Sequence, residues 1–63
     1  MKIESLILEK EIARQALSYK DVANRAGISE RTLKAARDGE RIRTATAGKI
    51  AAALGIAIDE IIK

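Results

Sequence analysis

Apolar residues recur every three or four positions along most of this chain, which is the spacing of one face of an α-helix. The first such stretch runs over residues 5–17, where the apolar positions fall four apart. This spacing predicts an amphipathic first helix that ends near Leu17. Its apolar rows consist of Leu8, Ile12 and Ala16, and of Ile3 and Ile7 beside them.

Two short helices with almost nothing between them are predicted next. Ser18 is suited to be the N-cap of the first, and Asp21, three residues later, can complete a capping box. Gly27 ends this helix, because the residue after the last turn commonly needs a positive φ. Ser29 is then the N-cap of the following helix, so the chain must turn sharply there. The small side chain of Ala23 lets the two backbones approach closely.

The rest of the chain predicts two further helices. The third helix ends at "DG" and is followed by the loop "ERIRT", residues 40–44. A fourth helix is predicted over about 46–54, with Thr44 or Thr46 as its cap and Gly55 as its stop. The last segment, "IAIDEIIK", predicts a short fifth helix with its acidic residues in the first turn, where the helix dipole favours them.

The composition supports a compact all-α, five-helix domain and weighs against catalysis. The chain has no proline, no cysteine and no histidine. This favours helix and removes disulfides, a thiol nucleophile and the usual zinc sites, so no metal or other cofactor is expected. The carboxylate pairs Glu9 with Glu11 and Asp59 with Glu60 suit helix surfaces better than acid–base chemistry. We therefore expect a single non-enzymatic domain over residues 1–63.

The net charge of +3 is concentrated in the middle of the chain, where residues 28–49 carry six basic and three acidic groups. A basic stretch suits a nucleic-acid partner, but it is equally typical of a solvated face. No apolar run approaches the ~20 residues that a membrane span needs. The N-terminus, "MKIESLILEKE", also lacks the apolar core of a signal peptide. These features predict a cytoplasmic protein.

The third helix carries the most distinctive polar face. On a helical wheel Leu33 and Ala36 define its buried side, whereas Arg31 and Lys34 lie nearly opposite, with Glu30 on the flank. Such a face can be ordinary solvated surface. The tight turn before it, the small residue at the crossing and the basic groups on both sides favour a binding surface instead.

Residues 19–38 resemble the helix-turn-helix of Xre-type and lambdoid phage repressor and Cro proteins. The downstream "GKIAAALGIAIDEII" is similar to that family's "KIAKALGVSLDELL" ending, and the resemblance covers roughly residues 8–62. The apolar, small and glycine positions of the motif are Val22, Ala23, Ala26, Gly27, Ile28, Leu33 and Ala36.

The resemblance implies a lambda repressor-like domain and a bacterial or phage-encoded, sequence-specific transcriptional regulator. Its third helix, about 30–37, would enter the major groove of double-stranded DNA. Dimers would read operator half-sites about one helical turn apart. A small repressor or Cro-like protein is the expected form.

The resemblance places Glu30, Arg31 and Lys34 at base-reading positions. Their chemistry fits, because Arg31 and Lys34 can approach guanine O6 and N7, and Glu30 can accept from cytosine N4. Ser29 and Thr32 are candidates for a phosphate or thymine-methyl contact. Capping explains Ser29 equally well.

Phosphate contacts are implied at both ends of the helix pair. Ser18 and Tyr19 match such positions at a helix N-terminus, which suits an anion. Tyr19 could equally be a surface ring that covers part of a small core. Arg41 and Arg43 lie in the loop that follows the DNA backbone in this family.

One position departs from the pattern of the family, which often pairs an arginine of the first helix with a glutamate late in the third. Ile12 and Arg37 stand at those positions here. We expect Arg37 to extend along the surface and pair with Glu9 or Glu11, or to turn to a phosphate.

A second function of a different class stays open, namely an antitoxin-like or adaptor module that binds a protein through apolar surfaces. The apolar residues near both ends exceed the obvious needs of a small core. We expect some of them to form a homodimer interface near the C-terminus, with the N-terminal set as a second candidate. They are Ile3, Leu6, Ile7, Ile56, Ile58, Ile61 and Ile62.

Overall fold

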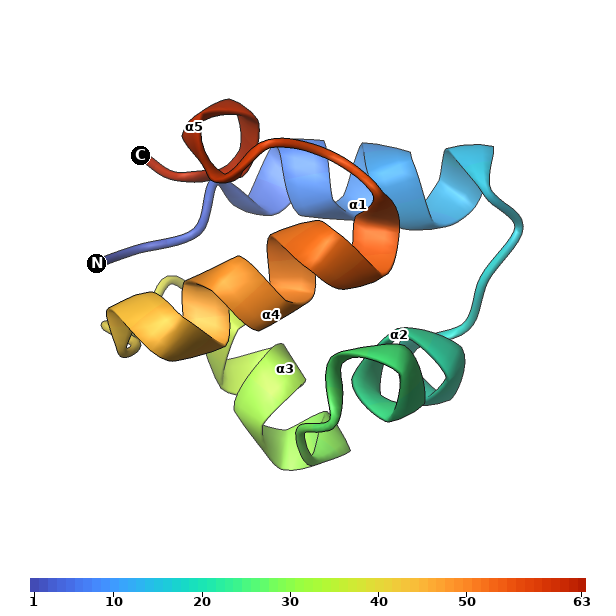
Figure 1. Cartoon of the computed structure of the whole chain (residues 1–63), viewed down its shortest axis with the longest axis horizontal. Helices are drawn as coiled ribbons and strands as arrows, with labels where there is room; N and C mark the ends of the chain where they lie inside the picture. The colour runs from blue at the N-terminus through green and yellow to red at the C-terminus, as the bar shows by residue number, and fades with distance from the viewer.

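The chain forms five helices, and the computed structural model describes all 63 residues. There is no β-strand, only an isolated antiparallel bridge between Ile3 and Ile62. The predicted all-α fold is therefore confirmed (Figure 1). The helices are α1 (Ser5–Arg14), α2 (Tyr19–Ala26), α3 (Glu30–Arg37), α4 (Thr44–Leu54) and α5 (Ile58–Ile61).

The two helices of the central pair begin at serine caps, as predicted. The Ser18 hydroxyl accepts from the Asp21 amide at 3.1 Å, and the Asp21 carboxylate accepts from the Ser18 amide at 3.0 Å. This is a complete capping box. Ser29 accepts from the Thr32 amide at 3.0 Å and starts α3 in the same way.

The start of α4 differs from the prediction. The helix begins at Thr44, and neither Thr44 nor Thr46 caps it. Arg43 takes the N-cap position with an extended backbone and no side-chain cap. Its carbonyl accepts from the Ala47 amide at 3.0 Å, which closes the first turn two residues earlier than expected.

The chain leaves α2 through a left-handed residue, Gly27, with a φ of 71°. The Gly27 amide donates to the Asn24 carbonyl, and the Ile28 amide donates to the Ala23 carbonyl. This paired return is the Schellman motif. It satisfies the last carbonyls of α2 and redirects the chain within two residues.

A Schellman motif also ends α1, where the Ala16 amide donates to the Ala13 carbonyl and the Leu17 amide donates to the Ile12 carbonyl. The left-handed residue there is Ala16, with a φ of 53°. The prediction that α1 runs to Leu17 with Ala16 in its apolar row is therefore wrong. The helix ends at Arg14, and Ala16 is exposed. An alanine in a position that glycine normally fills gives no signal of a helix end in the sequence.

The core is aliphatic and is assembled from every helix. In Figure 1, α4 crosses the middle of the molecule, with the α2–α3 pair on one side and α1 and α5 on the other. Helix α4 packs on α2 and α5, and α1 packs on α3 and α5. The buried cluster comprises Ile3, Leu8, Ile12, Val22, Ala23, Leu33, Ala36, Ala47, Ile50, Ala51, Leu54 and Ile61.

A side chain at each end of α1, Ser5 in its first turn and Gln15 at its C-cap, ties the helix to its neighbours by a hydrogen bond. The Ser5 hydroxyl donates to the carbonyl of Arg37 at the end of α3. The Gln15 amide group donates to the Leu54 carbonyl at the end of α4, at 2.7 Å. Helix α1 is thereby fixed at both ends against the helices it covers.

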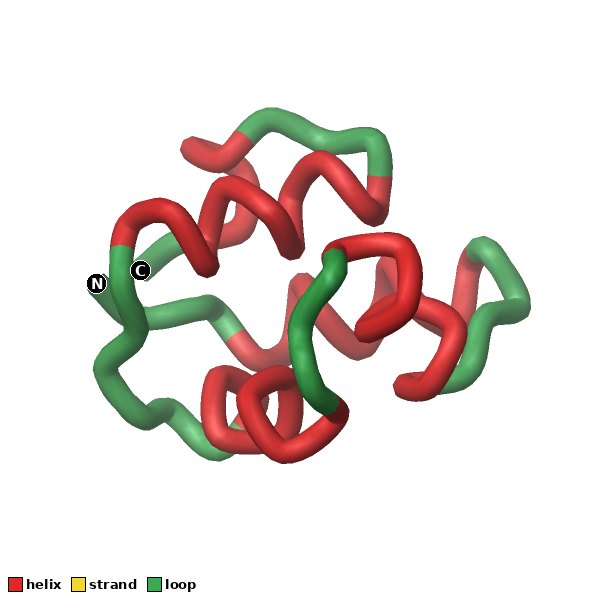
Figure 2. The backbone as a smooth tube through the Cα atoms, turned by 60° about the horizontal axis from the view of Figure 1, so that its bottom comes forward, coloured by secondary structure: helices red, strands yellow, loops and turns green.

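The N-terminal residues 1–4 lie between the loop after α3 and the end of the chain. The Ile42 amide donates to the Met1 carbonyl at 2.8 Å, and the Met1 amino group donates back to the Ile42 carbonyl at 3.3 Å. On the other side, the Glu4 amide donates to the Ile61 carbonyl at 2.7 Å. Figure 2 shows the two chain ends side by side.

This arrangement removes two residues from the expected docking surface. Ile3 and Ile61 are buried in the protein's own core, so the expectation that they could form a dimer interface is wrong for both. Among the large apolar side chains, Leu6 is 59% exposed and Met1 is 38% exposed. The apolar surface is therefore smaller than the sequence suggested, because two of its seven residues belong to the core.

Three substitutions test whether backbone conformation sets the helix ends. A Cβ at Gly27 would meet nothing within 4 Å, so Gly27→Ala adds only backbone strain and should lower the free energy of unfolding by about 1–2 kcal/mol. Gly48 lies within α4, where an added Cβ would also meet nothing, so Gly48→Ala should raise the free energy of unfolding by about 0.5–1 kcal/mol.

Ala16 has a positive φ, which glycine adopts without strain, so Ala16→Gly should raise the free energy of unfolding by less than about 1 kcal/mol.

Urea unfolding followed by circular dichroism measures all three changes. Gly27→Ala and Gly48→Ala are the same chemical change, so effects of the same sign would contradict the assigned role of the Gly27 turn.

Candidate nucleic-acid interface

The outer face of α3 is fully solvated, as the helical wheel predicted. Glu30, Arg31 and Lys34 are exposed, whereas Leu33 and Ala36 are completely buried. No ion pair involves the three exposed side chains, because the two salt bridges of the protein lie elsewhere. The face is thus charged and has no partner within the chain.

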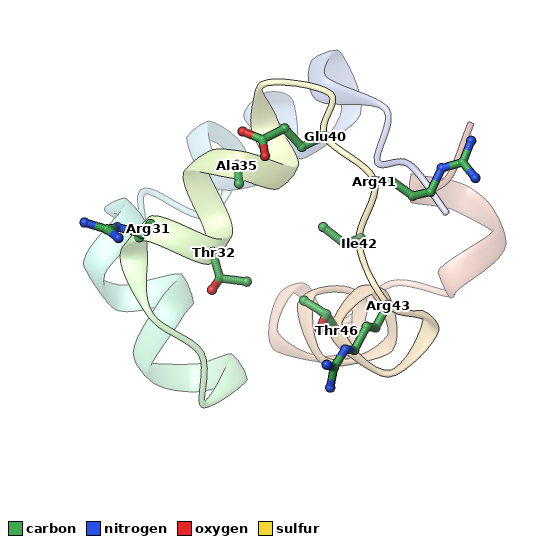
Figure 3. Close-up of a pocket in the computed structure, with 8 residues that line it drawn as sticks. All are labelled: Arg31, Thr32, Ala35, Glu40, Arg41, Ile42, Arg43 and Thr46. Atoms are coloured by element: carbon green, nitrogen blue, oxygen red, sulfur yellow. The ribbon is translucent and has the colours of Figure 1, made fainter.

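An open hollow of about 600 Å³ separates α3 from the loop and the start of α4. In Figure 3 the guanidinium groups of Arg31 and Arg43 extend outward from opposite sides of this hollow, and Arg41 turns away from it. The structure therefore places a predicted base-reading residue and both predicted loop arginines around the same hollow. The lining residues are Arg31, Thr32, Ala35, Glu40, Arg41, Ile42, Arg43 and Thr46.

Lys34 belongs to the adjoining part of the same surface. A second, smaller hollow on the outer side of α3 is lined by Arg31, Lys34, Ala35, Asp38 and Glu40. Glu40 borders both hollows and was not singled out from the sequence. The one feature of the sequence that distinguishes Glu40 is that it is the only acidic residue between Gly39 and Arg43.

The N-terminus of α4 adds donors beside Arg43. The first amides of any helix lack partners within the helix and carry the positive end of its dipole. At α2 and α3 a serine hydroxyl caps this end, but at α4 no side chain does. Arg43 and the free end of α4 therefore form one electropositive position.

The two serines predicted to touch phosphate are occupied by their caps. The Ser18 hydroxyl and the Asp21 carboxylate bond each other's backbone amides. The Ser29 hydroxyl accepts from the Thr32 amide and lies 2.9 Å from the Thr32 hydroxyl. Ser18 lies at the N-terminus of α2 and Ser29 at the N-terminus of α3. Their contact with phosphate stays a prediction.

Tyr19 is held against the protein rather than free. Its ring packs on the core, and its hydroxyl donates to Glu9 at 3.1 Å. The Arg37 guanidinium lies over the ring, 5.4 Å from its centre, within range of a cation–π contact. Burial, followed by the bond to Glu9, raises the pKa of the Tyr19 phenol.

The expected pairing of Arg37 with Glu9 or Glu11 is wrong. The Arg37 guanidinium donates to the Asp38 carboxylate at 3.0 Å. Glu11 is bound instead by Arg14 at 2.6 Å, and this bond lowers the pKa of Glu11. The Tyr19 ring lies between Glu9 of α1 and Arg37 of α3. Arg37 therefore stacks on the ring and pairs with Asp38 at the end of its own helix.

No helix combines the length and the apolar character that crossing a membrane requires. Nowhere do three side chains of histidine, cysteine, aspartate or glutamate gather in the manner of metal ligands.

Two eight-residue helices joined by a sharp turn, with the second exposing a charged face, define a helix-turn-helix domain. A family model described as "Cro/C1-type HTH DNA-binding domain" matches residues 3–63. The chain belongs to that family, which confirms the resemblance drawn from the sequence. Comparisons with curated proteins and with solved structures found no match.

The capping box predicts a dependence of stability on pH. The hydrogen bond from the Ser18 amide lowers the pKa of Asp21 below its usual value. Asp21 therefore stabilises the fold above the unfolded-state pKa of about 3.9, and this contribution is lost as pH falls through the lower folded-state pKa.

Asp21→Asn removes this ionisation and tests the assignment. Urea unfolding at several pH values should show a higher free energy of unfolding for the wild type than for the variant above about pH 4, with the difference shrinking as the pH falls further below that value. A difference that stays constant over that range would contradict the role given to Asp21.

Proposed function

We propose that this protein is a sequence-specific DNA-binding transcriptional regulator, a small cytoplasmic repressor or Cro-like protein. Helix α3 would lie in the major groove of an operator half-site. The observation that carries the proposal is that Arg31 of α3 and Arg41 and Arg43 of the loop line one open hollow, from which the guanidinium groups of Arg31 and Arg43 extend outward (Figure 3). No carboxylate forms an ion pair with these three arginines.

In this arrangement the exposed face of α3 reads bases. Arg31 and Lys34 suit the acceptors of guanine, and Glu30 suits the amino group of cytosine. Arg41, Arg43 and the free N-terminus of α4 suit the phosphates on one flank of the groove. Ser18, Tyr19 and Ser29 are proposed as further phosphate contacts on the other flank, at the starts of α2 and α3.

We also propose that the protein binds operator half-sites as a homodimer. The buried positions of Ile3 and Ile61 leave Leu6, Met1 and the partly buried C-terminal isoleucines for that interface. The same burial weakens the alternative of an apolar docking module, because two of the seven residues that suggested it belong to the core.

Two arginines should separate specificity from affinity. Arg31→Ala should relax the preference at one base pair, because a good bidentate base contact discriminates by about 1–3 kcal/mol. Arg43→Ala should weaken all duplexes about equally and make the slope of log K against log salt shallower by about 0.9 for each phosphate that the variant no longer binds.

Selection of duplexes from a random pool, followed by fluorescence anisotropy at several salt concentrations, measures both effects. Lys10→Ala on α1 is the matched control, since it also removes an exposed charge and should change neither quantity. A pool that yields no consensus at low salt would contradict the proposed function.

A further inference from the structure

A single unpaired carboxylate, that of Glu40, interrupts the basic surface around the two hollows. The charged residues that line the hollows are the basic Arg31, Lys34, Arg41 and Arg43 and the acidic Asp38 and Glu40. Asp38 is bound by Arg37 at 3.0 Å, so a cation of α3 offsets its charge. Glu40 is exposed and takes part in neither salt bridge of the protein. It is therefore the one acidic residue of this surface with no cation bound to it.

The position of the Glu40 side chain follows from the way α3 ends. The Gly39 amide donates to the Ala36 carbonyl at 3.1 Å, and Gly39 is left-handed, with a φ of 86°. The Glu40 amide donates to the Ala35 carbonyl, also at 3.1 Å, which completes a Schellman motif. Figure 3 shows the Glu40 side chain extending from the loop toward α3, whereas Arg41 extends away from it. The backbone thus holds the carboxylate beside α3.

The fold itself does not account for a negative charge at this position. The C-terminal end of a helix carries the negative end of its dipole, where a cation is favourable and an anion is not. Glu40 lies just beyond this end of α3, and its side chain is exposed rather than packed. Its charge therefore acts mainly on what approaches this surface from outside the chain.

We propose that Glu40 weakens binding to every DNA duplex by repelling the phosphates that Arg41, Arg43 and the start of α4 attract. This inference rests on the proposed function. Phosphate contacts supply most of the affinity that does not depend on sequence. A like charge beside the loop lowers that part of the affinity and leaves the base contacts of α3 in place. Residence on DNA then depends more on the bases that α3 reads.

A direct contact between Glu40 and a base is less well supported. In the major groove only the amino groups of cytosine and adenine could donate to a carboxylate. Glu40 belongs to the loop, and the next residues of this loop, Arg41 and Arg43, are proposed to meet phosphates. Repulsion needs no reach to the base edges, because charges act over about 10 Å at 0.1 M salt.

Glu40→Gln tests the repulsion, because it removes the charge and keeps the size of the side chain. The backbone bonds that end α3 do not involve this side chain, so the variant should fold normally. Fluorescence anisotropy at about 0.1 M salt should show an affinity about three- to tenfold above that of the wild type. The gain should be similar for selected duplexes and for scrambled duplexes of the same length. It should shrink as the salt concentration rises, because salt screens exposed charges.

Two further variants separate the charge of Glu40 from other effects. Glu60→Gln on α5 makes the same chemical change, and the same change of net charge, at an exposed residue that lines neither hollow. It should therefore raise the affinity much less than Glu40→Gln does. Glu40→Asp keeps the charge and should bind both kinds of duplex like the wild type.

Three outcomes would overturn this role of Glu40. The first is the same affinity for Glu40→Gln and Glu60→Gln. The second is a Glu40→Asp variant that gains as much affinity as Glu40→Gln. The third is a Glu40→Gln variant that loses affinity for selected duplexes alone, which would make Glu40 a base contact.

The proposed function fails separately. If the wild type binds selected and scrambled duplexes equally, sequence-specific regulation is contradicted, but the comparison of Glu40→Gln with Glu60→Gln still decides the role of Glu40. If the wild type binds no duplex at all, both the proposed function and this inference are wrong.

Discussion

The left-handed turn at Gly27 is the constraint on which the rest of the structure depends. Helices α2 and α3 have eight residues each, and isolated helices shorter than about 12–15 residues are marginal in water. The turn lets both bury their inner faces at once, with Val22 and Ala23 on α2 and Leu33 on α3 in one cluster. The inner face of α3, Leu33 and Ala36, is completely buried in the core. The opposite face is therefore left to the solvent.

The fold and the candidate interface are joined at a second point, the loop after α3. Residues 1–4 pair with Ile42 on one side and with the end of the chain on the other, so the terminal segments support the loop that carries Arg41 and Arg43. Side chains that we propose to touch DNA thus project from backbone fixed by distant parts of the sequence.

Local signals in the sequence predicted the helices that begin at Ser18 and Ser29, the end at Gly27 and the solvated face of α3, because caps and wheels depend on nearby residues. The end of α1 was missed, since Ala16 adopts a conformation that alanine rarely takes. The partner of Arg37 and the anchoring of Ile42 could not be predicted, because both depend on groups brought together only by the tertiary fold. The hollow between α3 and α4 was missed for the same reason.

We propose that α3 and the following loop form the face that meets DNA. An NMR titration of isotope-labelled protein with duplex DNA at low salt tests this residue by residue. We expect the largest amide shifts in α3, in residues 40–43 and in the first turns of α2 and α4, with α5 and the outer side of α1 nearly unchanged. Shifts that gather around Leu6 and α5, with α3 unaffected, would contradict it.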